Sequence, residues 1–426
     1  MFKAPRGTSD LLPPEQRYWR YVEQAASRVC QRFGYQRIDT PTFESSGLFV
    51  RGVGEQTDIV QKEMYVFDDR GGDPLTLRPE GTAPVCRSYL EHGMSNLPQP
   101  VRLYYFCPIF RYERPQAGRF REHHQFGVEA IGDADPTVDA EVIQLGWSYA
   151  QELGLRNLSL VVNSIGDLSC RPAYLQALKD YYRQHLPRLC QDCQGRYERN
   201  PLRLLDCKQE RCQAYVGGAP KSSDHLCDAC KEHWTRLLRY LNLLGIPYQT
   251  SHRLVRGLDY YTRTVFEIQP PEEGGQSTVL GGGRYDGLIQ ELGGPPTPGI
   301  GFGSGFERMV LNLKRQEVDV PEVAARPVVI VNDGSEVALE YGLSLAARLR
   351  KEDLTIVLAP AQRSLRAQMR YASSVKARYA LVIGEDEVTT RALSVRDMDS
   401  ARQEKVPEAD LSAYLLAAKT GMAQAG

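Results

Sequence analysis

The sequence has 426 residues, of which 42% are hydrophobic and 25% charged, and a chain of this size can bury sizeable cores in two or three domains. Its 52 basic and 53 acidic side chains give a formal net charge of −1, so no global basic excess points to nucleic acid or an anionic membrane. No apolar run approaches the roughly 20 residues of a membrane helix, and the N-terminus lacks the apolar stretch of a signal peptide. We therefore expect a cytoplasmic protein whose nucleic-acid contacts, if any, use a local patch.

The first three quarters of the chain are predicted to form a mostly antiparallel sheet with helices packed against it. Apolar positions recur at helical spacing from Pro14 to Phe33, and the β-leaning segment that follows contains Pro41, which suits an edge or interface strand. The later elements are a hairpin over 64–78, a hairpin over 101–131, a helix over 137–153, an inserted piece over about 166–245, strand-like residues 253–268, two glycine-rich segments over 281–287 and 299–305, and a helix containing Phe306 to Leu313. A polar linker over 314–327 then separates a small α/β domain.

Polar side chains gather on one face of the second hairpin. Arg111 and Glu113 lie two apart on a predicted strand and so share a face. The returning strand places the following residues on one face by the same rule: Arg119, Arg121, His123, Gln125, Gly127 and Glu129. Burying such a face against protein costs several kcal/mol, and the arginine fork suits phosphate oxygens, which favours a ligand site with room above Gly127. A solvated outer face of the sheet is the alternative.

Three other segments carry candidate ligand-binding groups. Residues 254–268 concentrate Arg256, Tyr260 and Tyr261, a set that can bind an anion and an aromatic group, although edge-strand tyrosines explain it equally well. The glycine-rich run 299–311 predicts a strand passing beneath a ligand, with Arg308 in the first turn of the next helix. The Gly/Pro-bounded loop over 77–84 offers Glu80 and Thr82 to an amino group or an imidazole N–H.

Six of the ten cysteines fall within one stretch of the inserted piece. The pairs Cys190-x₂-Cys193 and Cys227-x₂-Cys230 have the spacing of a four-thiolate zinc site, with Cys207 and Cys212 as surplus or replacement ligands. Such a zinc ion is expected to be structural, because four thiolates close its coordination shell. The alternative is a set of reduced thiols in a small helical insertion. The remaining four cysteines, at positions 30, 86, 107 and 170, are expected in the core.

Basic side chains cluster in the C-terminal α/β domain. Arg363, Arg366 and Arg370 are predicted on one face of its second helix, Lys376 and Arg378 follow, and residues 361–378 contain no acidic side chain. This pattern suits contact with nucleic-acid phosphates, although a solvated basic face remains the alternative.

Taken in order, these motifs resemble the class II histidyl-tRNA synthetases of bacteria along nearly the whole chain. The helix and Pro41 segment are similar to motif 1, FRYERPQAGRFREHHQFGVE to motif 2 and GIGFGSGFERMVL to motif 3, and LVRGLDYYTRTVFE and GGGRYDGL are similar to the two histidine-specific signatures. The resemblance implies an α+β fold with an antiparallel class II catalytic domain over 1–320, a helical insertion at about 170–245, and an anticodon-binding α/β domain over 327–426.

The resemblance also implies roles for individual residues. Arg111 is similar to the arginine that grips the α-phosphate of ATP, and Arg256 to the arginine that lies beside the same phosphate where other class II enzymes place a metal; both are implied to be catalytic. Glu113, His123 and Arg308 are the further ATP-binding residues. The implied histidine pocket contains Glu80, Gly81, Thr82, Arg111, Gln125, Glu129, Arg256, Tyr260 and Tyr261. Arg363, Arg366 and Arg370 are implied to contact tRNA.

The expected activity is ligation of L-histidine to tRNA(His), with ATP and Mg²⁺ required and a homodimer built on motif 1. Two alternatives remain at this point. A non-catalytic relative that binds histidine as a regulatory subunit usually lacks the anticodon-binding domain and has eroded signatures. A zinc-ribbon nucleic-acid-binding protein has no catalysis, so ATP–pyrophosphate exchange distinguishes it.

Overall fold

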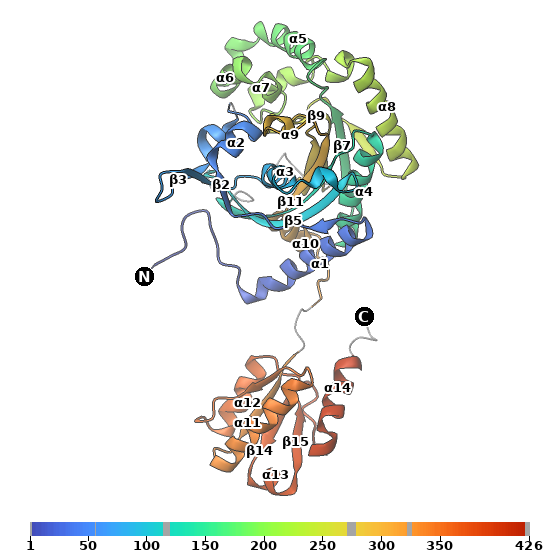
Figure 1. Ribbon diagram of the computed structural model, residues 1–426. Helices are drawn as coiled ribbons and strands as arrows, with labels where there is room; N and C mark the ends of the chain where they lie inside the picture. The colour runs from blue at the N-terminus through green and yellow to red at the C-terminus, as the bar shows by residue number, and fades with distance from the viewer. Residues whose placement is uncertain (1, 56, 114–119, 271–277, 322–325, 422–426) are drawn as a thin grey trace. The chain divides into compact units, whose positions relative to one another are not determined.

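The computed structural model describes residues 2–55, 57–113, 120–270, 278–321 and 326–421 (Figure 1). The chain folds into two compact units, residues 1–321 and 322–426. The loop of the second predicted hairpin, including Arg119, and residues 322–325 of the predicted linker lie outside the described residues. Within the described ranges, no helix has the length and apolar run needed to cross a membrane.

The first unit carries ten α-helices among its described residues, and most are amphipathic. They are α1 (Gln16–Arg32), α2 (Ser46–Val53), α3 (Thr82–Glu91), α4 (Pro136–Glu152), α5 (Arg171–Arg183), α6 (Gln191–Arg199), α7 (Glu210–Val216), α8 (Asp228–Leu243), α9 (Leu288–Glu291) and α10 (Phe306–Arg315). Its strands are β1 (Gln36–Arg37), β2 (Phe43–Ser45), β3 (Tyr65–Asp68), β4 (Pro74–Leu77), β5 (Val101–Phe110), β6 (Glu122–Ile131), β7 (Ser159–Ser164), β8 (Tyr248–Thr250), β9 (Thr262–Gln269), β10 (Leu280–Arg284) and β11 (Gly299–Gly305).

An eight-stranded sheet forms the centre of this unit, in the order β1-β5-β6-β11-β10-β9-β7-β8. Its six inner strands run antiparallel to their neighbours, and only the short edge strands β1 and β8 pair in parallel. The predicted antiparallel sheet is therefore confirmed. Strands β2, β4 and β3 form a separate antiparallel sheet, which contains the predicted hairpin over 64–78.

Alternate side chains of β6 face opposite sides of the central sheet, a side packed against helices and a side that we call the ligand side. Phe126, Val128 and Ala130 point into a core with α1, α4 and α10, in which Phe126 is completely buried. The alternate residues of β6, among them Gln125 and Glu129, face the other side of the sheet, because successive side chains of a strand point to opposite faces. Helix α3 covers part of this second side (Figure 1).

Several local predictions were wrong. Pro41 itself lies between β1 and β2 and belongs to neither, although both strands of its segment are edge strands, as predicted. The stretch 253–268 is a strand only from Thr262 onward, and the residues before it form turns, bends and irregular backbone. Strand β7 was missed, although its SLVVNS sequence pairs along its whole length with β9.

The segment between β7 and β8 contains the helices α5, α6, α7 and α8 (Figure 1). The last of these helices contributes Leu237 and Leu241 to the same core as α1 and α4. The insertion is thus anchored on the packed side of the sheet through α8.

The second unit is an α/β structure with a five-stranded sheet in the order β13-β12-β14-β15-β16. Its elements are β12 (Val328–Asn332), α11 (Glu336–Lys351), β13 (Ile356–Leu358), α12 (Leu365–Ser374), β14 (Tyr379–Ile383), α13 (Glu385–Thr390), β15 (Ala392–Asp397), β16 (Gln403–Pro407) and α14 (Leu411–Gly421). The alternation of strand and helix was predicted, whereas the antiparallel pair β15 and β16 was not. The last helix begins at Leu411 and not at Pro407.

Candidate active site

Two adjoining pockets open on the ligand side of the central sheet. The larger encloses about 260 Å³ and is lined by Arg111, Glu113, Phe120, His123, Gln125, Arg256, Glu267, Thr278, Val279, Leu280, Gly281, Gly303, Gly305, Glu307 and Arg308. The smaller encloses about 70 Å³ and is lined by Glu80, Thr82, Arg111, Gln125, Arg256, Leu258, Tyr260, Tyr261, Gly281, Tyr285, Gly301, Phe302 and Gly303. Arg111, Gln125 and Arg256 belong to both walls, so the two pockets meet at two guanidinium groups.

A hydrogen bond or an ion pair to the surrounding protein holds each of the two arginines at the junction. Arg111 lies just after β5 and donates from Nε to the Pro79 carbonyl at 2.7 Å. Arg256 pairs with the Glu267 carboxylate at 2.5 Å, and the Nε of Arg256 is buried without a hydrogen-bond partner among the described residues. The prediction that Arg111 and Glu113 lie on a strand was wrong, since β5 ends at Phe110.

Glycines of β10 and β11 let neighbouring side chains lie across the floor of the pockets. A Cβ at Gly303 would come within 1.6 Å of the Gln125 amide nitrogen, and one at Gly281 within 2.5 Å of the Arg256 guanidinium. The prediction of a strand passing beneath a ligand is consistent with this close approach. Gly127 serves a different purpose from the one expected, because the Tyr105 ring fills the space that a Cβ would occupy there.

Glu80 and Thr82 lie where the chain enters α3, beside the smaller pocket. The Glu80 carboxylate accepts from the backbone N–H groups of Thr82 at 2.7 Å and Ala83 at 2.8 Å, so it caps the first turn of the helix. Gly81 must lack a side chain, because its Cβ would stand 2.4 Å from the Tyr105 ring. The Tyr260 hydroxyl approaches the same carboxylate at 3.5 Å.

Glu129 lies behind the smaller pocket and is completely buried. Its carboxylate accepts from the Tyr285 hydroxyl at 2.6 Å, from Thr82 at 2.8 Å and from Tyr105 at 3.2 Å. Burial raises the pKa of Glu129 to about 8, although the three hydroxyl groups act in the opposite direction. Glu129 was predicted as a member of the histidine pocket; it does not line the cavity but holds Thr82 and Tyr285, which do.

This raised pKa predicts a pH-dependent stability. Below the unfolded pKa of about 4.3 the carboxyl is protonated in both states, and as the pH rises toward 8 the folded state must retain the proton or bury a charge. Wild-type stability should therefore fall relative to Glu129→Gln by up to about 1.4 kcal/mol per pH unit between pH 5 and 8. Urea unfolding across this range measures the difference. The control is Glu232→Gln, at an exposed residue of α8, whose free energy of unfolding should differ from that of wild type by the same amount at every pH. If the difference between Glu129→Gln and wild type were also independent of pH, the prediction would be wrong.

His123 and Arg308 lie on the wall of the larger pocket, together with Glu113. Burial, together with the nearby charges of Arg111 and Arg308, lowers the pKa of His123 to about 3. The imidazole is therefore neutral near pH 7. Arg308 lies in the first turn of α10, as predicted, and donates to the Thr278 carbonyl at 3.3 Å.

A buried ion-pair network supports the GGGRYDGL segment from beneath. Arg284 donates from Nε to the Asp139 carboxylate at 2.7 Å, and both side chains are completely buried. His233 at 2.8 Å and Thr264 at 2.6 Å bond to the other oxygen of Asp139. The network joins α4, α8, β9 and β10, so it ties the inserted segment to the floor of the site.

Several residues of the site were missed from the sequence. Tyr105 and Tyr285 hold the buried Glu129, Glu267 pairs with Arg256, and the Glu307 carboxylate accepts from the His124 backbone N–H at 2.9 Å. Tyr285 lies within the GGGRYDGL signature that was singled out, so that signal was available. Glu267 likewise ends the LVRGLDYYTRTVFE signature, but its position opposite the floor glycine Gly281 on the neighbouring strand follows only from the register.

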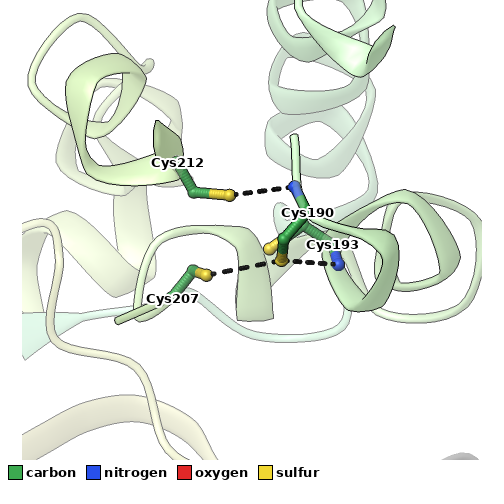
Figure 2. Close-up of side chains that lie close together, drawn as sticks. All are labelled: Cys190, Cys193, Cys207 and Cys212. Atoms are coloured by element: carbon green, nitrogen blue, oxygen red, sulfur yellow. Dashed lines mark hydrogen bonds between the residues drawn. The ribbon is translucent and has the colours of Figure 1, made fainter. Parts of the chain in front are cut away.

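The predicted grouping of cysteines was wrong. The Sγ atoms of Cys190, Cys193, Cys207 and Cys212 lie within 4.8 Å of one another (Figure 2). Cys227 and Cys230 belong to a second group, with Cys170 and the carboxylate of Asp167. Spacing defines each Cys-x₂-Cys pair but not its partner, and α7 together with the turn after it leads the chain away from the first pair before Cys227. None of the ten cysteines forms a disulfide, and Cys30, Cys86 and Cys107 are core residues as expected.

The basic cluster of the second unit is only partly helical. Arg366 and Arg370 lie one turn apart on α12, whereas Arg363 belongs to the turn before the helix. All three are exposed. Arg378, which was expected to extend the patch, instead pairs with Asp397 at 2.9 Å and Asp399 at 2.7 Å.

Comparison with known proteins gives the family. A histidyl-tRNA synthetase family model matches residues 7–309, and an anticodon binding domain model matches residues 327–418. The chain belongs to the histidyl-tRNA synthetase family. Relatives named histidine–tRNA ligase include one from Dehalococcoides mccartyi, 55% identical over 96% of this chain and 97% of that one. Another, from Caldanaerobacter subterraneus, is 48% identical over 95% and 97%.

A solved structure of the family agrees with the fold. The apo histidyl-tRNA synthetase of S. aureus superposes with a TM-score of 0.81 at 38% identity, covering 97% of this chain and 99% of that one. The expected class II α+β fold and the expected family are thus confirmed, and this member of the family is an aminoacyl-tRNA synthetase.

Proposed function

We propose that this chain joins L-histidine to tRNA(His) in two steps, with histidine in the smaller pocket and ATP in the larger. The observation that carries this proposal is the meeting of the two pockets at Arg111 and Arg256. In the first step a histidine carboxylate oxygen attacks the α-phosphorus of ATP, and pyrophosphate leaves. In the second step the 3′-terminal hydroxyl of tRNA attacks the acyl carbon of the adenylate, and AMP leaves.

Arg111 and Arg256 act on the α-phosphate in this proposal. Both guanidinium groups stand at the boundary where the carboxylate and the phosphate must meet, because both arginines line both pockets. Fixed donors stabilise the charge that develops on the α-phosphate without reorganisation at the moment of reaction. The step needs little acid–base chemistry, so position and charge carry its rate.

The larger pocket supplies the remaining ATP contacts. Arg308 and Glu113 stand at its wall, and the neutral His123 ring offers a flat surface to adenine. The carboxylates of Glu267 and Glu307 line this pocket and would be the oxygen ligands of Mg²⁺, with Glu267 shared between the ion and Arg256. A bound Mg²⁺ supplies positive charge against the β- and γ-phosphate oxygens.

The smaller pocket selects histidine through buried polar groups. Glu80, Thr82, Gln125 and the two tyrosines 260 and 261 surround it, and Glu129 fixes Thr82 from behind. Gly81 keeps the entrance to α3 close to Tyr105. A side chain that cannot bond to these groups leaves them unpaired, which permits discrimination by about 10⁴ without editing.

Histidine-dependent ATP–pyrophosphate exchange tests this function. Exchange stimulated by histidine alone, among a panel of amino acids, is the expected result. Folded protein that binds histidine but supports no exchange would favour the regulatory relative, and a protein that binds only nucleic acid would favour the non-catalytic binding module. Either result would overturn the proposal.

The exposed arginines of the second unit are proposed to contact tRNA phosphates. The double variant Arg366→Glu/Arg370→Glu should raise the KM for tRNA in aminoacylation about tenfold or more, because phosphate contacts dominate affinity. Exchange, which needs no tRNA, should be unchanged. Charge reversal at exposed Lys351 on α11 is the matched control. An unchanged tRNA KM in the double variant would remove these arginines from the interface.

We also propose a homodimer that uses the small sheet β2-β4-β3. Phe43 and Phe67 share one face of it, with ring centroids 6.3 Å apart and exposed fractions of 51% and 42%. Paired exposed aromatic rings typically mark an interaction surface. Phe43→Glu should shift the sedimenting species from twice the chain mass to the chain mass, whereas Leu243→Glu, at an exposed apolar residue of α8, should not. A dimer that survives Phe43→Glu would exclude this face.

A further inference from the structure

The four cysteines at 190, 193, 207 and 212 form a compact sulfur cluster in the inserted segment (Figure 2). All four side chains are buried, with exposed fractions of 5%, 0%, 4% and 1%. They come from the start of α6, from the turn before α7 and from α7 itself. No described pair is a disulfide, so four reduced sulfur atoms face one another in the interior.

The spacing of these sulfur atoms matches a tetrahedral metal site. The Sγ atoms of Cys190 and Cys207 lie 3.8 Å apart, and all four lie within 4.8 Å of one another. A zinc ion bound to four thiolates at about 2.3 Å separates each pair of sulfur atoms by about 3.8 Å in tetrahedral geometry. A disulfide requires about 2.05 Å, so the observed distance suits shared coordination better than oxidation.

Backbone N–H groups point at two of the sulfur atoms. The N–H of Cys193 donates to the Cys190 sulfur at 3.4 Å, and the N–H of Cys190 donates to the Cys212 sulfur at 3.2 Å. Cys190 is the N-cap of α6, where the helix dipole favours negative charge. Hydrogen bonds to an anion stabilise it, so these two N–H groups favour the thiolate forms of Cys190 and Cys212 that a metal requires.

The surrounding segment has a structural reason for a cross-link. Helices α6 and α7 have only nine and seven residues, shorter than the roughly 12 residues that isolated helices need to be even marginally stable. A metal that joins three separate pieces of chain contributes folding free energy directly.

We propose that Cys190, Cys193, Cys207 and Cys212 bind one structural Zn²⁺ ion that fixes α6 and α7 in the inserted segment. Four thiolates leave no open coordination position, so the ion takes no part in the reaction. Thiolate ligands select zinc over magnesium or calcium, and tetrahedral sulfur geometry suits it.

The second group carries no such proposal. Its only oxygen ligand, Asp167, already accepts from the Ser169 hydroxyl at 2.6 Å and the Ser169 N–H at 3.0 Å, and it lies 3.5 Å from Arg263. Its carboxylate therefore has partners without a metal, and Cys227 is only partly buried. This group supplies the matched control.

The test compares Cys207→Ser with Cys227→Ser in the full-length chain, using metal analysis and Co²⁺ substitution. Wild type should contain zinc, and Cys207→Ser should contain one equivalent less. The Co²⁺ protein should show the sulfur-to-metal charge-transfer and d–d bands of a four-thiolate tetrahedral site, which Cys207→Ser loses and Cys227→Ser retains. Cys207→His, which restores a ligand, should regain the metal with a shifted spectrum.

Three results would overturn the proposal. They are a wild-type chain without zinc after growth in zinc-supplemented medium, a Cys207→Ser variant with the wild-type zinc content, and a four-thiolate spectrum lost in Cys227→Ser but kept in Cys207→Ser. Should Cys207→Ser fail to fold, the Co²⁺ spectrum of Cys227→Ser decides the matter, because this variant has lost a ligand of the second group and keeps all four cysteines of the proposed site; a Cys227→Ser protein without a four-thiolate spectrum would overturn the proposal.

Discussion

Arg256→Ala should lower the rate constant of histidine-dependent ATP–pyrophosphate exchange by about 10²–10³, the usual cost of removing one fixed donor to developing charge. The KM values for histidine and ATP should change far less, because the interaction strengthens as the α-phosphate gains charge. Arg256→Lys should recover little of the loss, since a lysine ammonium cannot both pair with Glu267 and present a planar fork to the phosphate. Exchange kinetics with varied histidine and ATP measure these values.

The exposed neighbour Arg253 provides the control for this experiment. Arg253→Ala removes the same charge three residues earlier and should leave exchange within about twofold of wild type. If Arg256→Ala reduced the rate constant less than tenfold, or raised KM alone, Arg256 would be a ground-state binding residue and the proposed role on the α-phosphate would be wrong.

Asp139→Ala should destabilise the first unit by about 3–5 kcal/mol, because it leaves the Arg284 guanidinium buried and unpaired. Urea unfolding followed by tryptophan fluorescence measures this unit alone, since Trp19, Trp147 and Trp234 are the three tryptophans of the chain. The surface pair Arg183–Asp180, with exposed fractions of 66% and 52%, gives the matched control. Asp180→Ala should cost less than about 1 kcal/mol. If Asp139→Ala and Asp180→Ala lowered the free energy of unfolding by similar amounts, the buried network would not stabilise the unit as predicted.

The same network predicts an acid dependence of stability. Burial alone would raise the pKa of Asp139. The charge of Arg284 and the hydrogen bond from His233 lower it by more than burial raises it, so the pKa lies below its ordinary value. A depressed folded-state pKa stabilises the protein above the unfolded pKa of about 3.9 and ceases to do so as the pH falls through the folded value. The difference in the free energy of unfolding between wild type and Asp139→Ala should therefore become smaller below about pH 4 and stay constant from pH 5 to 8.

Local periodicity was sufficient to predict the hairpin of β5 and β6, the side of β6 that faces the pockets, and the helix that carries Arg308. These features depend on neighbours in the sequence, where the periods of two and 3.6 apply. The resemblance to the synthetase motifs then supplied the family and the order of the domains.

Features that depend on contacts between residues far apart in the sequence could not be predicted from local periodicity. Arg256 and Tyr261 precede β9, which begins only at Thr262, and they lie in irregular backbone and not in a strand. The pair Cys190 and Cys193 is grouped with Cys207 and Cys212 and not with Cys227 and Cys230, which depends on the path of the chain between them. Glu267 reaches Arg256 only through the pairing of β9 with β10.

The glycine floor formed by Gly281 and Gly303 makes the site vulnerable in an unusual way. Neither residue offers a functional group, yet one added methyl at either position would collide with Arg256 or Gln125. A substitution to alanine at either position, which conventional similarity scores treat as mild, would therefore displace the Arg256 guanidinium or the Gln125 amide from the wall of the site.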